Sequence, residues 1–79
     1  MTKLEKTVQQ LLNRPASLRY VEIEKVLKYH GFEIIMAKGS HKKFKHPSLA
    51  NDLVIPVHNN DCKDFYKTLA SKIVKKLIT

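Results

Sequence analysis

The spacing of apolar residues changes twice along the chain, and this limits the folds that it can adopt. Up to about residue 30 apolar side chains recur every three or four residues, as on one face of a helix. Residues 32–57 instead form short apolar or alternating runs with brief links, and helical spacing returns over residues 64–78. Strands joined by such short links pair as antiparallel neighbours. The pattern predicts an α+β domain, with a three-stranded antiparallel sheet covered by helices on one face.

Signals at the ends of the segments set the expected bounds. Thr2 and Glu5 have the spacing of a capping box, Pro15 ends the first helix, and Gly31 suits the position after the second. Residues 59–61 form a loop that could cap the final helix. We expect helices over residues 2–13, 20–30 and 64–78, and strands over residues 32–37, 41–46 and 53–57. In the final helix, the expected apolar stripe consists of Phe65, Leu69, Ile73 and Leu77, widened by Tyr66, Ala70 and Val74.

Charge gives the first indication of function. The 79 residues suffice for one domain, and 15 Lys and Arg against 7 Asp and Glu give a net charge of +8. Such an excess favours an anionic partner, which can be nucleic acid, an acidic membrane or an acidic protein. No acidic residue occurs in residues 34–51, so the positive charge is concentrated there.

The compartment follows from what the sequence lacks. Cys62 is the single cysteine, which excludes an internal disulfide and fits a reducing environment. No apolar run approaches the ~20 residues of a membrane helix. The N-terminal segment has no continuous apolar stretch of the kind found in secretory signals. We expect a cytoplasmic protein with no membrane partner.

Alternation along the second predicted strand separates its side chains onto two faces. Phe44 is the one large apolar residue and should face the helices, together with Lys42 and His46. The residues expected on the solvent face are His41, Lys43 and Lys45. An imidazole would then lie beside ammonium groups on an open surface.

That grouping suits cleavage of RNA. An imidazole titrates near neutral pH and can take or give a proton, while lysines hold phosphates. The RNA 2′-hydroxyl can be the nucleophile, so neither a metal nor a cofactor is required. The candidates are His41 as general acid or base, Lys38, Ser40, Lys43 and Lys45 as RNA-binding residues, and Gly39 as the tight-turn residue. Spacing alone leaves open that His41 is an ordinary solvated side chain.

Two other kinds of chemistry compete for the same residues. His41, His46, His58 and Cys62 offer four zinc ligands, but they lack the tight pair typical of zinc sites, and alternation separates the first two. Cys62 could act as a nucleophile, although a half-buried apolar role is more common. His58 either ends the third strand or serves as a second proton donor. The three tyrosines lie at helix positions, where packing is the default.

Three blocks resemble the HicA toxin family. Residues 38–47, Lys-Gly-Ser-His-Lys-Lys-Phe-Lys-His-Pro, are similar to its G-S-H-x-x-F signature followed by a polar residue and H-P. Residues 53–58 resemble the family's apolar strand ending near P-x-H. Residues 26–32 resemble its helix that closes in a Gly-aromatic step. The resemblance covers about residues 18–77 of a single domain and leaves an extra N-terminal helix and joint over residues 1–16.

The resemblance implies a fold like a double-stranded-RNA-binding domain and metal-independent mRNA cleavage by His41. It also implies a HicB-type antitoxin that covers the active face. The chain could form a homodimer or a hetero-oligomer with this antitoxin. The alternatives are a noncatalytic RNA-binding module and a protein-interaction domain. Lys67 stands where the family usually has a small residue, which puts the start of the last helix in doubt. The extra helix could pad the sheet, form a dimer or bind the partner.

Overall fold

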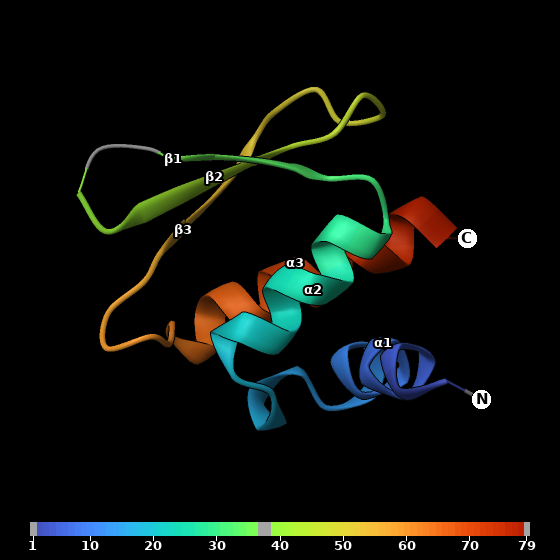
Figure 1. Cartoon of the computed structure of the whole chain (residues 1–79). Coiled ribbons are helices and arrows are strands. Elements are labelled where there is room, and N and C mark those ends of the chain that lie inside the picture. Colours follow the sequence, from blue (N-terminus) through green and yellow to red (C-terminus); the bar gives the residue numbers. More distant parts are fainter. Residues whose placement is uncertain (1, 37–38, 79) are drawn as a thin grey trace.

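The structure is a computed structural model that describes residues 2–36 and 39–78. In this part of the chain, a sheet lies on a pair of helices, and an additional helix lies on the other side of that pair (Figure 1). The elements are α1 (Lys3–Asn13), a 3-10 turn η1 (Pro15–Ser17), α2 (Tyr20–Tyr29), β1 (Glu33–Met36), β2 (His41–Lys45), β3 (Leu53–Pro56) and α3 (Asp64–Ile78). The predicted α+β class, with its three-stranded antiparallel sheet and extra N-terminal helix, is confirmed.

The sheet has one buried and one open face. Its order is β1-β2-β3, with both pairs antiparallel. Phe44, Leu53 and Ile55 point into the core and are almost fully buried. Ile35 and Val54 lie on the other face, where 36% and 40% of their surface is exposed. The open face that the alternation predicted is therefore present.

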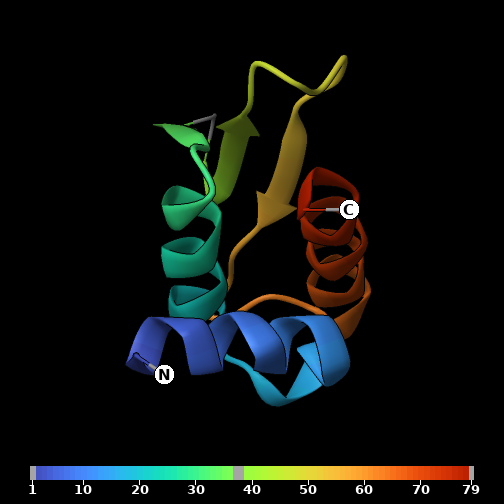
Figure 2. The ribbon, with the colours of Figure 1, turned by 90° about the vertical axis from the view of Figure 1, so that its right-hand side faces the viewer.

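The helix α1 extends the core from the side away from the sheet. It crosses α2 and α3 rather than the strands (Figure 2), and its Val8 and Leu11 join the core. The capping box forms as predicted, since Thr2 Oγ1 accepts the Glu5 N–H at 3.1 Å and the Glu5 carboxylate accepts the Thr2 N–H at 3.2 Å. The suggestion that this helix pads the sheet is therefore wrong, because it packs on α2 and α3. No helix in the described ranges has the length and apolar character needed to cross a membrane.

The first strand begins one residue later than predicted because Phe32 belongs to the cap that ends α2, while Ala37, its predicted last residue, lies outside the described residues. Gly31 has a φ of +90°, its N–H donates to Lys28 O, and the Phe32 N–H donates to Leu27 O, both at 3.0 Å. These two bonds form a Schellman motif, which satisfies the last carbonyls of a helix. Phe32 is consequently buried against the core before β1 begins at Glu33.

The loop over residues 59–61 caps α2 rather than the final helix, which corrects the prediction. His58 and Asp61 pair through their backbones around a two-residue turn in which Asn59 and Asn60 have positive φ. Asp61 Oδ1 then accepts the N–H of Tyr20, the first residue of α2, at 3.0 Å. The tight turn thus carries a carboxylate to a helix end 41 residues away in sequence.

The buried face of α3 agrees only in part with the predicted stripe, of which Ala70 and Val74 are fully buried. Its buried residues are Lys67, Ala70, Ser71 and Val74, whereas Phe65 is 68% exposed. Leu69, Ile73 and Leu77 are only partly buried at the border of the core. Lys67 does not disturb the start of the helix, because α3 begins at Asp64 as predicted.

Candidate functional site

His41 is the first residue of β2 and is exposed. It lies directly opposite Pro56 of β3. The adjoining turn is fixed by one backbone bond, in which the Val57 N–H donates to Ser40 O at 3.0 Å. Gly39 has a φ of +69°, a left-handed conformation that suits glycine. The turn and the end of β3 together hold the backbone that carries His41, while Lys38 lies outside the described residues.

Carboxylates flank the lysines on the open face. Lys43 Nζ lies 3.5 Å from Asp52 Oδ2, and both side chains are partly exposed. Lys45 lies directly opposite Glu33 of β1, at the distance where cross-strand side chains interact. These acidic neighbours bracket the basic segment in sequence, and strand pairing brings them beside it. The sequence reasoning missed them because it followed one strand at a time.

His46 lies apart from this face and has a structural environment. Its Nε2 donates to His30 O at 2.9 Å, and its Nδ1 accepts the Ser48 N–H at 3.0 Å. Its ring packs against Phe32, with 4.8 Å between the ring centroids. These contacts fix the tautomer with the proton on Nε2, and they tie the end of β2 to the end of α2.

The zinc alternative is not supported by the geometry. Among residues 2–36 and 39–78, no three His, Cys, Asp or Glu side chains are grouped so that they could hold a metal ion. His41, His46, His58 and Cys62 therefore do not form the four-ligand zinc set of this alternative. The nucleophile alternative is also disfavoured, because burial raises the pKa of the half-buried Cys62 thiol and so opposes the reactive thiolate.

A polar cluster behind the end of β3 was not anticipated. Asp61 Oδ1 accepts the N–H groups of Tyr20 and Cys62 at 3.0 and 2.9 Å, and it lies 3.3 Å from Lys67 Nζ. Burial acts to raise the pKa of Asp61, but the two N–H bonds and the Lys67 ammonium lower it below its ordinary value. A sequence signal existed, since Lys67 shares a helical stripe with Ala70 and Val74.

Comparison with known families decides the identity. Residues 20–77 match the family model of the HicA toxin of bacterial toxin-antitoxin systems. The chain belongs to the HicA toxin family. Searches among curated proteins and among solved structures returned no match.

Membership gives a role at a coarse level. The HicA-family chain is a toxin of a toxin–antitoxin system, and the family implies an antitoxin partner and an RNA substrate. The matched residues run from the start of α2 almost to the end of α3, so they include the whole sheet and His41. The helix α1 lies outside them.

Proposed function

We propose that the chain is a metal-independent endoribonuclease that cleaves mRNA, with His41 as its catalytic residue. The single observation that carries this proposal is the position of His41, exposed at the start of β2 within the HicA-matched residues. The Ser40–Val57 backbone bond gives this histidine a defined place beside a turn. An open sheet face with lysines lies next to it.

The proposed reaction uses groups of the RNA itself. The 2′-oxygen attacks the adjacent phosphorus while the bond from phosphorus to the 5′-oxygen breaks. The products are a 2′,3′-cyclic phosphate and a 5′-hydroxyl. His41 either takes the proton from the 2′-hydroxyl or gives one to the leaving 5′-oxygen, and water serves the other end. General acid–base help of this kind contributes typically about 10²–10⁴-fold.

RNA would lie on the open face of the sheet. We assign phosphate contacts to Lys38, Lys43 and Lys45, and a turn contact to Ser40. Because Lys43 is already paired with Asp52, a phosphate must exchange with that carboxylate or be shared with it. The neighbouring carboxylates would thereby lower the affinity of this face for RNA.

The same face would also bind the antitoxin, which we propose to be of the HicB type and to act in the cytoplasm. Ile35 and Val54 flank Lys43 in one row across the three strands and leave exposed apolar surface around it. Apolar surface rimmed by charge is typical of protein interfaces. An antitoxin seated there would exclude RNA from His41.

The family-like core would be residues 18–77, within one domain of residues 1–79.

The test is fragment analysis of a single-stranded RNA incubated with purified protein in EDTA. We compare the native chain with His41→Ala and with His58→Ala, a matched loss of another exposed imidazole. Cleavage by the native chain and by His58→Ala, but not by His41→Ala, is the expected result. Loss in both variants would make His58 the second proton donor.

Two outcomes would contradict the proposal. Equal cleavage by the native chain and His41→Ala would point to another catalytic residue or to a contaminant. RNA binding without fragments from any sample would favour the noncatalytic RNA-binding module. That second function predicts a steep salt dependence, which His41→Ala leaves unchanged.

A further inference from the structure

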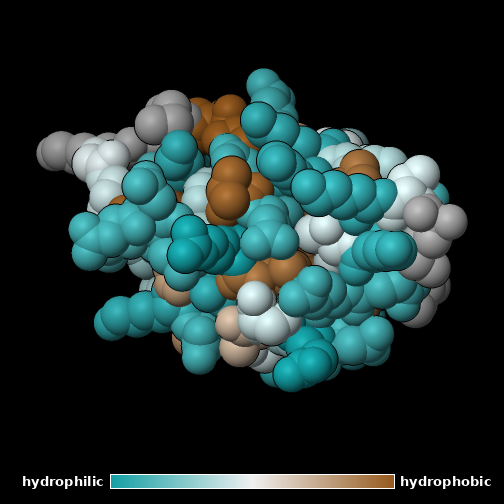
Figure 3. All heavy atoms as spheres, turned by 60° about the horizontal axis from the view of Figure 1, so that its bottom comes forward, coloured by the Kyte–Doolittle hydropathy of each residue, from teal (hydrophilic) through white to brown (hydrophobic). Residues whose placement is uncertain are grey.

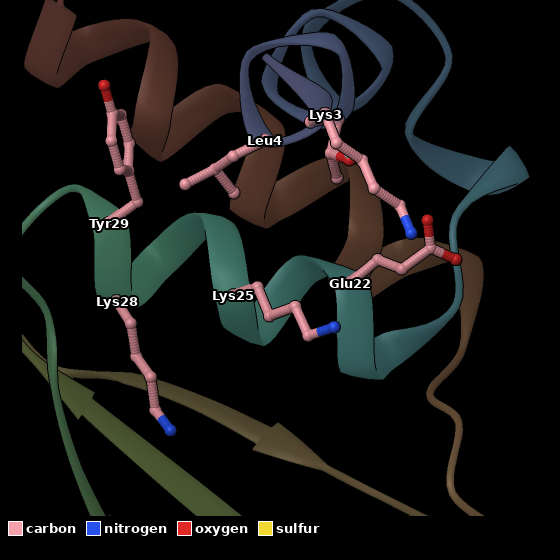
Figure 4. A pocket seen from close by; sticks show the side chains of 7 residues that line it. Lys3, Leu4, Glu22, Lys25, Lys28 and Tyr29 are labelled. Atoms are coloured by element: carbon pink, nitrogen blue, oxygen red, sulfur yellow. The ribbon is translucent and has the colours of Figure 1, made fainter.

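A groove of about 840 Å³ runs between α1 and α2, away from the sheet. Figure 4 shows the Leu4 side chain projecting from α1 into the space between the Tyr29 ring and Lys25 of α2. Leu4 is partly buried and Tyr29 is 59% exposed, so apolar surface is open to a ligand. The volume lies in the range of sites that hold a few side chains or a small molecule, about 300–1,000 Å³.

The rim of the groove is mostly basic. Lys3 comes from α1, Lys25 and Lys28 come from α2, and Glu22 is the one acidic lining residue. In Figure 4 the end of Lys3 points toward the Glu22 carboxylate, and Lys25 extends along α2 toward the base of the Glu22 side chain. Lys28 points away from α1. A ligand would therefore meet apolar surface at Leu4 and Tyr29 with positive charge beside it. Figure 3 shows hydrophobic patches among hydrophilic side chains on this side of the molecule.

We propose that the groove between α1 and α2 binds an acidic amphipathic helix of a partner protein. Its apolar stripe would cover Leu4 and the Tyr29 ring, and its carboxylates would face Lys3 and Lys25. Helix-in-groove binding of this kind needs an apolar floor with polar flanks, and the groove has both. The antitoxin is the expected source of this helix, and only this assignment of the partner rests on the proposed function.

Charge decides against a second copy of the chain as the occupant. Each copy carries a net charge of +8, so two copies would repel one another at a groove whose own rim is basic. An acidic partner gains from the same charge. RNA is also an anion, but Glu22 lies in the groove wall, and Leu4 offers apolar surface that a phosphodiester backbone cannot use.

The location of the groove separates its role from that of His41. The groove is built on α1, which lies beyond the residues that match the HicA family and on the other side of α2 and α3 from the sheet (Figures 1 and 2). A partner held there would leave the open sheet face accessible. The groove would thus add anchoring to the complex, independent of the contact that blocks RNA.

The test uses a synthetic peptide of roughly 15 residues, with Leu at helical spacing and Glu elsewhere, labelled with a fluorophore. A scrambled peptide of the same composition is its control. Anisotropy gives the affinity, and amide NMR spectra of the ¹⁵N-labelled chain give the location. The groove variant, Lys3→Gln with Lys25→Gln, is compared with an α3 variant, Lys72→Gln with Lys76→Gln, which removes two exposed charges far from the groove lining.

We expect amide shifts concentrated in α1 and α2, and binding roughly three- to tenfold weaker in the groove variant. The α3 variant and His41→Ala should bind the peptide as the native chain does, so this result stands even if the nuclease proposal fails. Shifts confined to the sheet, equal weakening by the α3 variant, or equal binding of the scrambled peptide would each overturn the proposal. Larger shifts in the groove with an RNA oligonucleotide would overturn it in favour of an RNA site.

Discussion

Lys67 Nζ lies 3.3 Å from Asp61 Oδ1, and only 7% of the Lys67 side chain is exposed against 44% of the Asp61 side chain. The pair joins α3 to the turn that follows β3. The same Asp61 oxygen accepts the first N–H of α2, so three separate segments meet at one carboxylate. Because β3 holds the turn before His41, this carboxylate also helps to position the candidate active site.

Substitution of Asp61 and substitution of Lys67 should lower the free energy of unfolding by different amounts. Asp61→Ala leaves a buried ammonium and two N–H groups without their acceptor, and we expect it to lower the free energy of unfolding by about 2–3 kcal/mol. Lys67→Met removes the buried charge, keeps the length of the side chain and leaves Asp61 near water, so its cost should stay within about 1 kcal/mol. Urea denaturation of both variants measures the difference. Equal losses would mean that the lysine contributes mainly through its charge.

The lowered pKa of Asp61 gives the pair a pH signature. A carboxyl whose pKa is lower in the folded state stabilises the fold above its unfolded pKa, and this contribution is lost as pH falls through the folded pKa. Asp61→Asn keeps an acceptor oxygen and removes the charge. Its destabilisation relative to the native chain should be full above about pH 5 and shrink below about pH 4. Urea midpoints measured across that range would contradict the assignment if the difference stayed constant.

The buried hydroxyl of Tyr20 destabilises the fold, and a substitution can remove it. The residue is 4% exposed and, among the described residues, its Oη has no hydrogen-bond partner. Burial, with smaller effects of Glu24 and Cys62, raises the pKa of this hydroxyl, so it stays neutral. We expect Tyr20→Phe to stabilise the fold by about 1 kcal/mol, because a buried unpaired hydroxyl costs about 1–3 kcal/mol. Tyr29→Phe on the exposed face of α2 is the control, and thermal denaturation of both shows whether the effect depends on burial.

Local signals in the sequence predicted the elements well, and long-range contacts account for the errors. The capping box and Gly31 act within a few residues. Local sequence alone therefore identified the start of α1 and the end of α2. Asp61 was assigned to the nearer helix, but a side-chain cap goes to whichever helix end the fold brings close. The burial of Lys67 was not predicted, because it depends on a partner in another segment.

The candidate site divides in the same way. Period two along β2 placed His41 on the face opposite Phe44, since alternation is a property of one strand. The neighbours of Lys43 and Lys45 depend on the register with β1 and β3, which the sequence did not specify. The spacing of apolar residues likewise predicted a first helix with one apolar face, but it could not show that this helix forms a groove with α2.

Substitution of His46 should lower the stability of the fold, whereas substitution of His41 should abolish RNA cleavage. His46→Ala loses two hydrogen bonds and the contact with Phe32, so we expect about 1–3 kcal/mol of destabilisation with RNA cleavage per folded molecule retained. His41→Ala should leave stability within about 0.5 kcal/mol, as for an exposed side chain, and abolish cleavage. Urea denaturation and cleavage assays on the same preparations separate the two effects. A fully folded His46→Ala protein without activity would place His46 in the chemistry.

Asp52 should restrain RNA binding. Its carboxylate lies 3.5 Å from Lys43 Nζ, so Asp52→Asn releases an ammonium on the face that we assign to RNA. In a His41→Ala background that prevents cleavage, we expect RNA affinity to rise roughly three- to tenfold. One added phosphate contact should steepen the slope of log affinity against log salt by about 0.7 for a single strand.

A change in overall charge alone must be separated from this effect. Asp64→Asn removes one negative charge from the exposed start of α3 and changes the net charge by the same amount. If Asp52 acts through Lys43, the Asp64 variant should change affinity less than twofold, and adding Lys43→Gln should cancel the gain from Asp52→Asn. Equal gains from the two Asp variants would show that RNA responds to net charge and that Lys43 makes no specific contact.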